Sequence, residues 1–226
     1  FGHDPFAKNA MIDTAENAST RLGIGAAELN EVTLARFAQY QAALADDRAF
    51  QRRYMVEAPL SDSGFRKQTG TLAVDEGIFP TTAEGLVKLK PVKPNGTHTF
   101  GTQTHPADGN AGMIVTTRET ARELSANPAI EVELLGFGQA RVEKGYMPLA
   151  PVPAAQTALK QAGLSIKDVD AVKSHNPFAA NDIAFARATG FPLEKMNNYG
   201  CSLVWGHPQG PTGLRSAIEL IEELAL

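Results

Sequence analysis

The sequence contains a single cysteine, Cys201, and no apolar run approaches the roughly 20 residues that a membrane-spanning helix needs. One cysteine excludes an internal disulfide and is typical of a reducing compartment, so we predict a cytoplasmic protein without a membrane partner. The first residues carry neither an initiator methionine nor a signal-peptide pattern. We therefore expect that the sequence begins inside a longer protein.

An excess of positive charge is also missing. The 226 residues include 21 Lys and Arg against 25 Asp and Glu, which gives a formal net charge of -4. Binding to nucleic acid or to an anionic membrane by electrostatics needs a basic surface, so neither partner is predicted. No glycine-rich phosphate loop or dinucleotide fingerprint follows a predicted strand, and a nucleotide cofactor is therefore not expected.

The most informative run is a Gly-His-Pro turn, which the residue pattern places between an apolar strand and a long amphipathic helix that starts near Thr212. Gly206 allows the chain to turn sharply, and Pro208 fixes φ directly after the histidine. His207 is therefore held by backbone geometry. An imidazole with a near-neutral pKa can act there as a general base or a general acid.

This run resembles the Gly-His-Pro signature of the thiolase family, and six further segments follow in the order known for that family. The segment 174–180 is similar to the Asn-Glu-Ala-Phe signature in a variant that begins with histidine, His175. The other similar segments are 11–18, 74–76, 89–91, 108–109 and 151–154. A lone Gly-His-Pro would be a weak signal, whereas these ordered segments extend over nearly the whole chain.

The resemblance implies an α/β fold: a thiolase-like layered α/β/α domain with an incomplete second half, and an irregular, helix-containing loop domain. We predict a substrate-covering loop domain over 1–107 and a C-terminal thiolase-like α/β domain over 108–226 that lacks its last strands. Hydrophobic periodicity predicts the same alternation of strands and helices. The predicted helices span 28–45, 119–125, 152–162 and 178–188, and the predicted strands span 113–117, 130–138 and 169–173, before a glycine-rich strand and the last helix.

The chemistry that the resemblance implies is acyl transfer between thiols through a cysteine acyl-enzyme. The sequence matches neither the family's segment with the nucleophilic cysteine nor its Cys-x-Gly segment, so we expect both cysteines to lie outside these residues. His207 would take the thiol proton and hydrogen-bond the thioester oxygen. His175 would hold a water or donate directly to the developing oxyanion. The alternative for His175 is a histidine with satisfied hydrogen bonds at the end of a strand.

Three residues are candidates for contacts with the acyl-CoA substrate. By resemblance, Phe178 would pack against the pantetheine arm, Met11 would line the acyl end of the pocket, and Thr104 would contact CoA. Asn176 replaces the family's usual glutamate, and His105 stands where glycine is usual. His105 either enlarges the polar part of the pocket or lies in an exposed turn.

Cys201 matches neither of the family's catalytic cysteines. We predict that it is a small buried residue, with a relocated nucleophile beside His207 as the alternative. A basic group could contact the phosphates of CoA or could form a solvated face; its members are Arg48, Arg52, Arg53, Arg66 and Lys67.

The resemblance also bears on partners and cofactors. It implies a homodimer or homotetramer, acyl-CoA and CoA as substrates, and no metal or redox cofactor; a small acyl-CoA-binding partner protein is a further option. Two alternative functions remain. One is a noncatalytic or partner-dependent thiolase-like subunit that binds CoA. The other is a metal hydrolase, although its four candidate ligands lack the short spacing of zinc signatures; they are His105, Asp108, His175 and His207.

Overall fold

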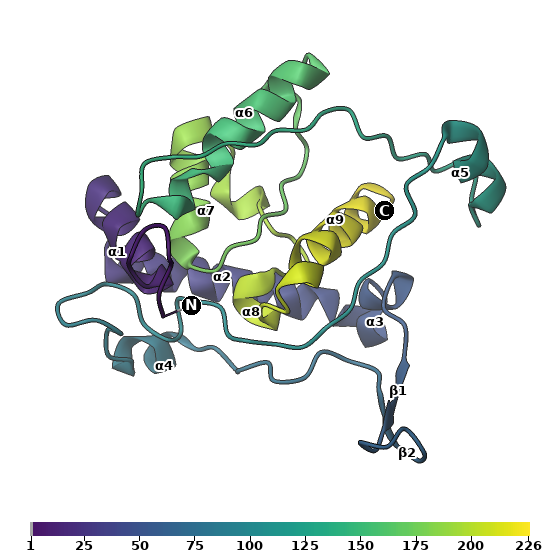
Figure 1. Ribbon diagram of the computed structural model, residues 1–226, viewed down its shortest axis with the longest axis horizontal. Coiled ribbons are helices and arrows are strands. Elements are labelled where there is room, and N and C mark those ends of the chain that lie inside the picture. Colours follow the sequence, from purple (N-terminus) through teal and green to yellow (C-terminus); the bar gives the residue numbers. More distant parts are fainter. Residues whose placement is uncertain (1) are drawn as a thin grey trace.

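The computed structural model describes residues 2–226, which form a mainly helical body (Figure 1). The α-helices are α1 (Met11–Leu22), α2 (Ala26–Ala43), α3 (Ala45–Arg48), α4 (Ala83–Lys88), α5 (Arg118–Leu124), α6 (Pro151–Ala162), α7 (Ala179–Thr189), α8 (Ser202–Trp205) and α9 (Gly210–Leu224). The strands are β1 (Ala58–Ser61) and β2 (Gln68–Leu72). Four 3-10 turns are η1 (Gln51–Arg53), η2 (Met147–Leu149), η3 (Ile166–Asp168) and η4 (Leu193–Lys195). No helix within 2–226 is long and apolar enough to cross a membrane.

The helices predicted from periodicity are all present, whereas α1 was not predicted. Helices α2, α5, α6, α7 and α9 occupy the predicted positions with shifts of about two residues at their ends. Local signals explain the limits of α6, which has proline in its first turn and ends at Gly163 in the left-handed conformation, with φ 71°. Proline is pre-organised for a first helical turn, and glycine adopts positive φ without strain.

Helix α7 lies at the centre of the body. It packs against α1, α2 and α6, and its first seven residues are all buried. Ile183 belongs to a core cluster with Leu29 and Val32 of α2, while Phe185 belongs to a second cluster with Phe191. Because α7 is held on several sides, the segment that leads into it, residues 174–178, has a fixed position.

A buried carboxylate ties this segment to the rest of the fold. Asp182 Oδ2 accepts hydrogen bonds from Arg36 Nε at 2.8 Å, Asn176 Nδ2 at 2.8 Å and Asn197 Nδ2 at 3.0 Å. Its Oδ1 accepts from Ser174 Oγ at 2.7 Å. The Arg36 and Asp182 side chains are 1% and 0% exposed. The pair therefore joins α2 to α7 away from water.

Two further ion pairs, one buried and one half-buried, connect residues distant in sequence. Lys173 Nζ contacts Glu219 Oε2 at 3.1 Å, and both side chains are buried. Arg215 binds Glu219 and, with two of its nitrogens, Asp75. Tyr54 also donates to Glu219, at 2.8 Å. Elements on both sides of the predicted division at residues 107 and 108 thus share one ionic network, and the division itself stays a prediction.

Three predicted strands are wrong. Within 2–226 the only sheet is the antiparallel hairpin β1–β2, and residues 113–117 and 130–138 run as extended chain without strand pairing. Their apolar side chains face solvent; Ile114 is 77% and Phe137 73% exposed. The segment 169–173 makes one isolated bridge, between Val172 and Met196. A strand needs a neighbour to satisfy its backbone hydrogen bonds, and no strand within the described residues 2–226 lies beside these segments.

The glycine-rich strand predicted before the Gly-His-Pro turn is also wrong, because these residues form helix α8. Trp205 N donates to Cys201 O at 3.1 Å and Gly206 N donates to Ser202 O at 3.0 Å, which is helical bonding. A short apolar run does not distinguish a buried strand from a buried helix.

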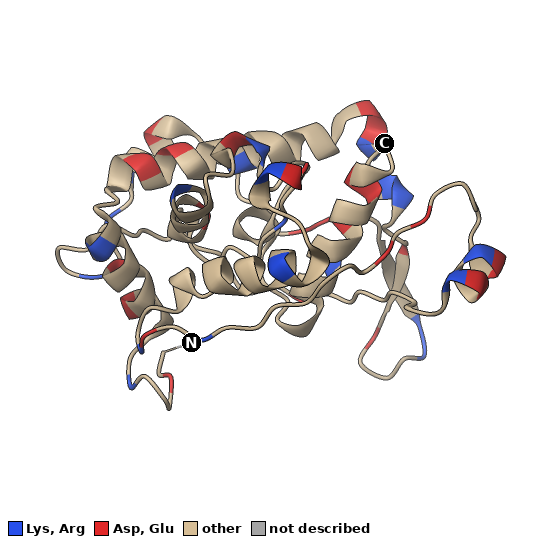
Figure 2. Cartoon of the chain, turned by 90° about the horizontal axis from the view of Figure 1, so that it is seen from above, with Lys and Arg blue, Asp and Glu red and all other residues tan. Residues whose placement is uncertain are grey.

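Charged residues of both signs are intermixed along the helices (Figure 2). Several of them pair with each other, as in Arg21 with Glu143 and Arg187 with Glu28. The mixed pattern agrees with the small net charge of -4.

Candidate active site

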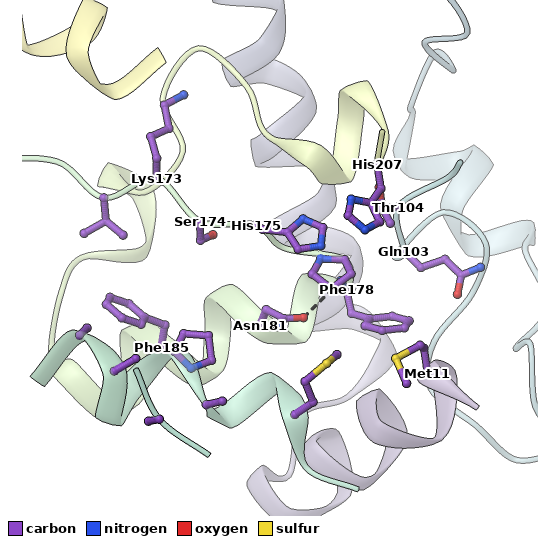
Figure 3. A pocket seen from close by; sticks show the side chains of 18 of the residues that line it. Met11, Gln103, Thr104, Lys173, Ser174, His175, Phe178, Asn181, Phe185 and His207 are labelled. Atoms are coloured by element: carbon purple, nitrogen blue, oxygen red, sulfur yellow. Dashed lines mark hydrogen bonds between the residues drawn. The ribbon is translucent and has the colours of Figure 1, made fainter. Parts of the chain in front are cut away.

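A cavity of about 1180 Å³ lies between α1, α6 and the segment that leads into α7. Most of its lining is apolar and comes from α6 and from residues near α1 and α7. All five residues predicted to be catalytic or to bind substrate line this cavity; they are Met11, Thr104, His175, Phe178 and His207 (Figure 3). The structure thus brings together residues that span nearly the entire sequence.

The two histidines lie against each other. The ring centroids of His175 and His207 are 4.2 Å apart with an angle of 26° between the ring planes. His175 precedes α7, and His207 lies between α8 and α9. His207 Nδ1 is 2.7 Å from Thr212 Oγ1 in the first turn of α9, and its backbone N donates to His105 O at 2.8 Å. A single bound carbonyl group is small enough to contact both rings.

The turn around His207 depends on glycine and proline, as its sequence predicts. Gly206 has φ 90°, and a Cβ there would lie 2.8 Å from Ala107 Cβ and 2.9 Å from His105 Nε2. Pro208 packs close to Gly109, where an added Cβ would approach its ring at 3.1 Å. These contacts place His207 by backbone shape and steric fit.

Both imidazoles favour the neutral form. Burial, and to a smaller extent the neighbouring His207, lowers the pKa of His175 to about 4. Burial also lowers the pKa of His207 from its ordinary value. A neutral imidazole has one nitrogen that donates a hydrogen bond and one that accepts, so each ring offers one donor and one acceptor at neutral pH.

The protein is expected to lose stability in acid through His175. Because the folded pKa of about 4 lies below the ordinary 6.5, the unfolded chain binds this proton first. The contribution of His175 to the free energy of unfolding is therefore complete above pH 6.5 and is lost as pH falls toward 4. Urea denaturation of the wild type and of His175→Gln, at a series of pH values through this range, measures it. The wild type should lose more stability than the variant, and equal losses would contradict the assignment.

Cys201 is a buried structural residue in this arrangement. Its side chain belongs to the apolar core and is 1% exposed, and Asn176 Nδ2 donates to its Sγ at 3.2 Å. Burial, followed by the charge of Asp182, raises the pKa of the Cys201 thiol to about 11. A thiol that stays protonated is a poor nucleophile, so the structure favours packing over the alternative of a relocated nucleophile.

Cys201 is expected to resist alkylation while the protein is folded. At pH 8 a pKa of about 11 leaves so little thiolate that iodoacetamide should react more than about 100-fold more slowly than with the unfolded chain. Mass-spectrometric mapping of the adduct, with and without denaturing urea, measures both rates. Rapid labelling of Cys201 in the folded protein would contradict its structural role.

The remaining candidate residues have defined surroundings. Phe178 is 5% exposed, and its ring packs edge-on against His98 with centroids 5.4 Å apart. The Thr104 hydroxyl donates to the backbone oxygen of Ser202. His105 lines the cavity beside Phe79, and burial lowers its pKa. His105 thus lies at the site and not in an exposed turn.

Three of the five basic residues proposed to contact phosphate have partners within the protein. Arg52 pairs with Asp47, and Arg53 with Glu222. Arg48 donates to the backbone oxygen of Ala73.

The metal-hydrolase alternative finds no support in the arrangement of side chains. Residues 2–226 contain no group of three or more His, Cys, Asp or Glu side chains arranged to hold a metal ion.

Sequence reasoning missed the partners of the two histidines. Ser202 Oγ lies 2.8 Å from His175 Nδ1, and Thr212 Oγ1 lies 2.7 Å from His207 Nδ1. Thr212 follows His207 by five residues, at the start of a predicted helix, which is a local signal that could have found it. Ser202 is 27 residues from His175 and had no such signal.

Comparisons with known proteins identify the family that this chain resembles. The family model described as the thiolase C-terminal domain matches residues 129–226. Peroxisomal 3-ketoacyl-CoA thiolase A of Mus musculus is 35% identical over 216 residues, which are 93% of this chain and 50% of the relative. Beta-ketothiolase BktB of Cupriavidus necator is 32% identical, with 98% of this chain and 55% of the relative covered.

Solved structures extend the likeness to the fold. The acetyl-CoA acetyltransferase of Bacillus anthracis superposes with a TM-score of 0.88 at 28% identity, over 99% of this chain and 56% of that chain. Human mitochondrial 3-ketoacyl-CoA thiolase in complex with CoA gives 0.81 at 27% identity, over 99% and 54%. The predicted thiolase-like α/β fold class is confirmed. The chain spans about half the length of the relatives it matches, and it belongs to the thiolase family, whose C-terminal half it resembles.

Proposed function

We propose that the protein is a thiolase-type acyltransferase acting on acyl-CoA or 3-ketoacyl-CoA, with its nucleophilic cysteine outside these residues. The stacked pair of His175 and His207 in a large apolar cavity carries this proposal. The names of the relatives, 3-ketoacyl-CoA thiolase and acetyl-CoA acetyltransferase, support acyl-CoA as the substrate class.

In this reaction His207 acts as the general base. Its neutral imidazole takes the proton of the attacking thiol and then, as imidazolium, hydrogen-bonds the thioester oxygen. His175, in ring contact with it, helps to bind the same oxygen. The apolar lining accommodates the acyl chain, with Met11 and Phe178 beside it and Thr104 on the CoA side. This chemistry uses CoA as substrate and needs neither a metal nor a redox cofactor.

Location and assembly are also parts of the proposal. The single cysteine supports a cytoplasmic protein, although relatives carry peroxisomal and mitochondrial names. We propose a homodimer or homotetramer, with a small acyl-CoA-binding protein as a further partner. Size-exclusion chromatography with light scattering tests the assembly, and a monomer would contradict it.

A second candidate is a partner-dependent subunit that binds CoA without catalysing transfer. It is favoured by the state of Cys201, whose pKa is raised to about 11 by burial, so that it offers no ready nucleophile. Incubating the full-length protein with acetoacetyl-CoA and CoA separates the two candidates. Formation of acetyl-CoA, with an acyl adduct on a cysteine other than Cys201, supports the transferase. CoA binding without turnover or adduct would replace it by the subunit.

A further inference from the structure

The side-chain amide of Asn176 can adopt only one orientation. Leu203 N donates to Asn176 Oδ1 at 3.1 Å, and a backbone N–H can only donate. On the other side, Asn176 Nδ2 lies 2.8 Å from Asp182 Oδ2, a carboxylate oxygen that also receives Arg36 Nε. Exchanging the amide oxygen and nitrogen would place donor against donor and acceptor against acceptor. Asn176 Oδ1 is therefore an acceptor with a fixed position.

This orientation determines the direction of the Ser202 hydroxyl. Ser202 Oγ lies 3.1 Å from Asn176 Oδ1, 3.1 Å from Asn176 N and 2.8 Å from His175 Nδ1. Its single proton must point to Asn176 Oδ1, because that oxygen cannot donate. Its two lone pairs remain for the other two contacts. His175 Nδ1 must then be the donor in its bond to Ser202.

We propose that Ser202 is a positioning residue that holds His175 as the Nδ1–H tautomer, so that Nε2 accepts a hydrogen bond from a hydroxyl, thiol or water in the cavity. A neutral ring with its proton on Nδ1 has a lone pair on Nε2. His175 lines the cavity, and its burial and its contact with His207 favour the neutral form.

The catalytic consequence rests on the proposed function. A lone pair on Nε2 cannot donate to a carbonyl oxygen, so His175 does not stabilise the oxyanion directly. A water can give one hydrogen to Nε2 and the other to the carbonyl oxygen, which makes water the intermediary. Of the two roles expected for His175, holding a water and donating directly, this geometry selects the first.

The same reasoning does not constrain His207 and His98, which makes them internal controls. Thr212 Oγ1 can donate to or accept from His207 Nδ1, since a hydroxyl group can do either. His98 Nε2 lies 2.8 Å from Ser19 Oγ, a second pair of a buried histidine and a serine. Ser19→Ala is therefore a matched control for Ser202→Ala: each removes one hydroxyl from one histidine.

Nitrogen NMR of the full chain with 15N-labelled histidine measures the tautomers. The chain has five histidines, so the signals can be assigned by single substitution, with His175→Gln identifying His175. Between pH 6 and 8, His175 should show a protonated Nδ1 and an unprotonated Nε2. Ser202→Ala should move the proton largely to Nε2, Ser202→Thr should restore it to Nδ1, and Ser19→Ala should leave His175 unchanged.

Two results would overturn the inference. One is a protonated Nε2 on neutral His175 in the wild type, and the other is an Nδ1–H tautomer that persists in Ser202→Ala. If Ser202→Ala does not fold, the wild-type spectrum alone decides. The spectra need no turnover. An inactive protein with the expected tautomer would therefore remove the proposed function and leave the role of Ser202 intact.

Discussion

Asp182→Asn is expected to lower the free energy of unfolding by about 3–5 kcal/mol, because it leaves Arg36 as a buried charge without its counterion. Arg36 and Asp182 are 1% and 0% exposed, and water cannot replace the lost carboxylate. The new amide would also direct NH₂ hydrogens at the amide donors of Asn176 or Asn197. Urea denaturation followed by circular dichroism at pH 7 measures the loss.

An exposed ion pair provides the control. Arg21 and Glu143 lie 2.6 Å apart, with side chains 40% and 62% exposed. Glu143→Gln should therefore change the free energy of unfolding by less than about 1 kcal/mol. If Asp182→Asn were as mild as this control, the buried carboxylate would not be the junction between α2 and α7 that the hydrogen bonds describe.

His207→Ala in the full-length protein is expected to lower acyl transfer by about 100- to 10,000-fold, the range for loss of a general base. No burst of CoA and no trapped acyl-enzyme should appear, because the thiol is no longer deprotonated. Alkylation of the nucleophilic cysteine should also slow near pH 7, since less thiolate is present. Rapid-quench assays and iodoacetamide inactivation measure the two effects.

Two variants separate this role from nonspecific damage. His175→Ala should leave alkylation nearly normal while turnover falls by roughly 100- to 1000-fold, because its loss removes only stabilisation of the oxyanion. His3→Ala, at an exposed position, should leave both unchanged. Equal alkylation rates in wild type and His207→Ala from pH 6 to 9 would show that His207 does not activate the thiol, and would favour the partner-dependent subunit.

The sequence predicted what depends on local patterns. Helices α2, α6, α7 and α9 follow from apolar spacing together with proline and glycine at their ends. The strands at 113–117 and 130–138 could not be predicted in the same way, because a strand forms only beside a neighbour that pairs with its backbone. Spacing along one segment shows which face would be apolar and says nothing about whether that neighbour is present.

The family motif predicted which histidines lie at the site, but the local structure expected before one of them was wrong. The residue pattern placed His207 directly after an apolar strand, yet His207 follows helix α8. The family motif nevertheless identified both histidines that the structure places in one cavity. The network behind them, Asn176 with Ser202 and Asp182, could not be predicted, because its members are 6 and 26 residues apart and no pattern in the sequence connects them.

Two ion pairs that cross the division between residues 107 and 108 limit how this chain can be recombined with its relatives. Arg36 and Asp75 lie before that division, while their partners Asp182 and Arg215 lie after it. A chimera that takes residues 1–107 from another thiolase inherits half of each pair. Unless the donor supplies the matching charge at both positions, the hybrid leaves Asp182 as a buried ion without its counterion and removes one of the two partners of Arg215. Exchange at this division is therefore governed by charge complementarity, and overall sequence identity is a poor guide to which hybrids fold.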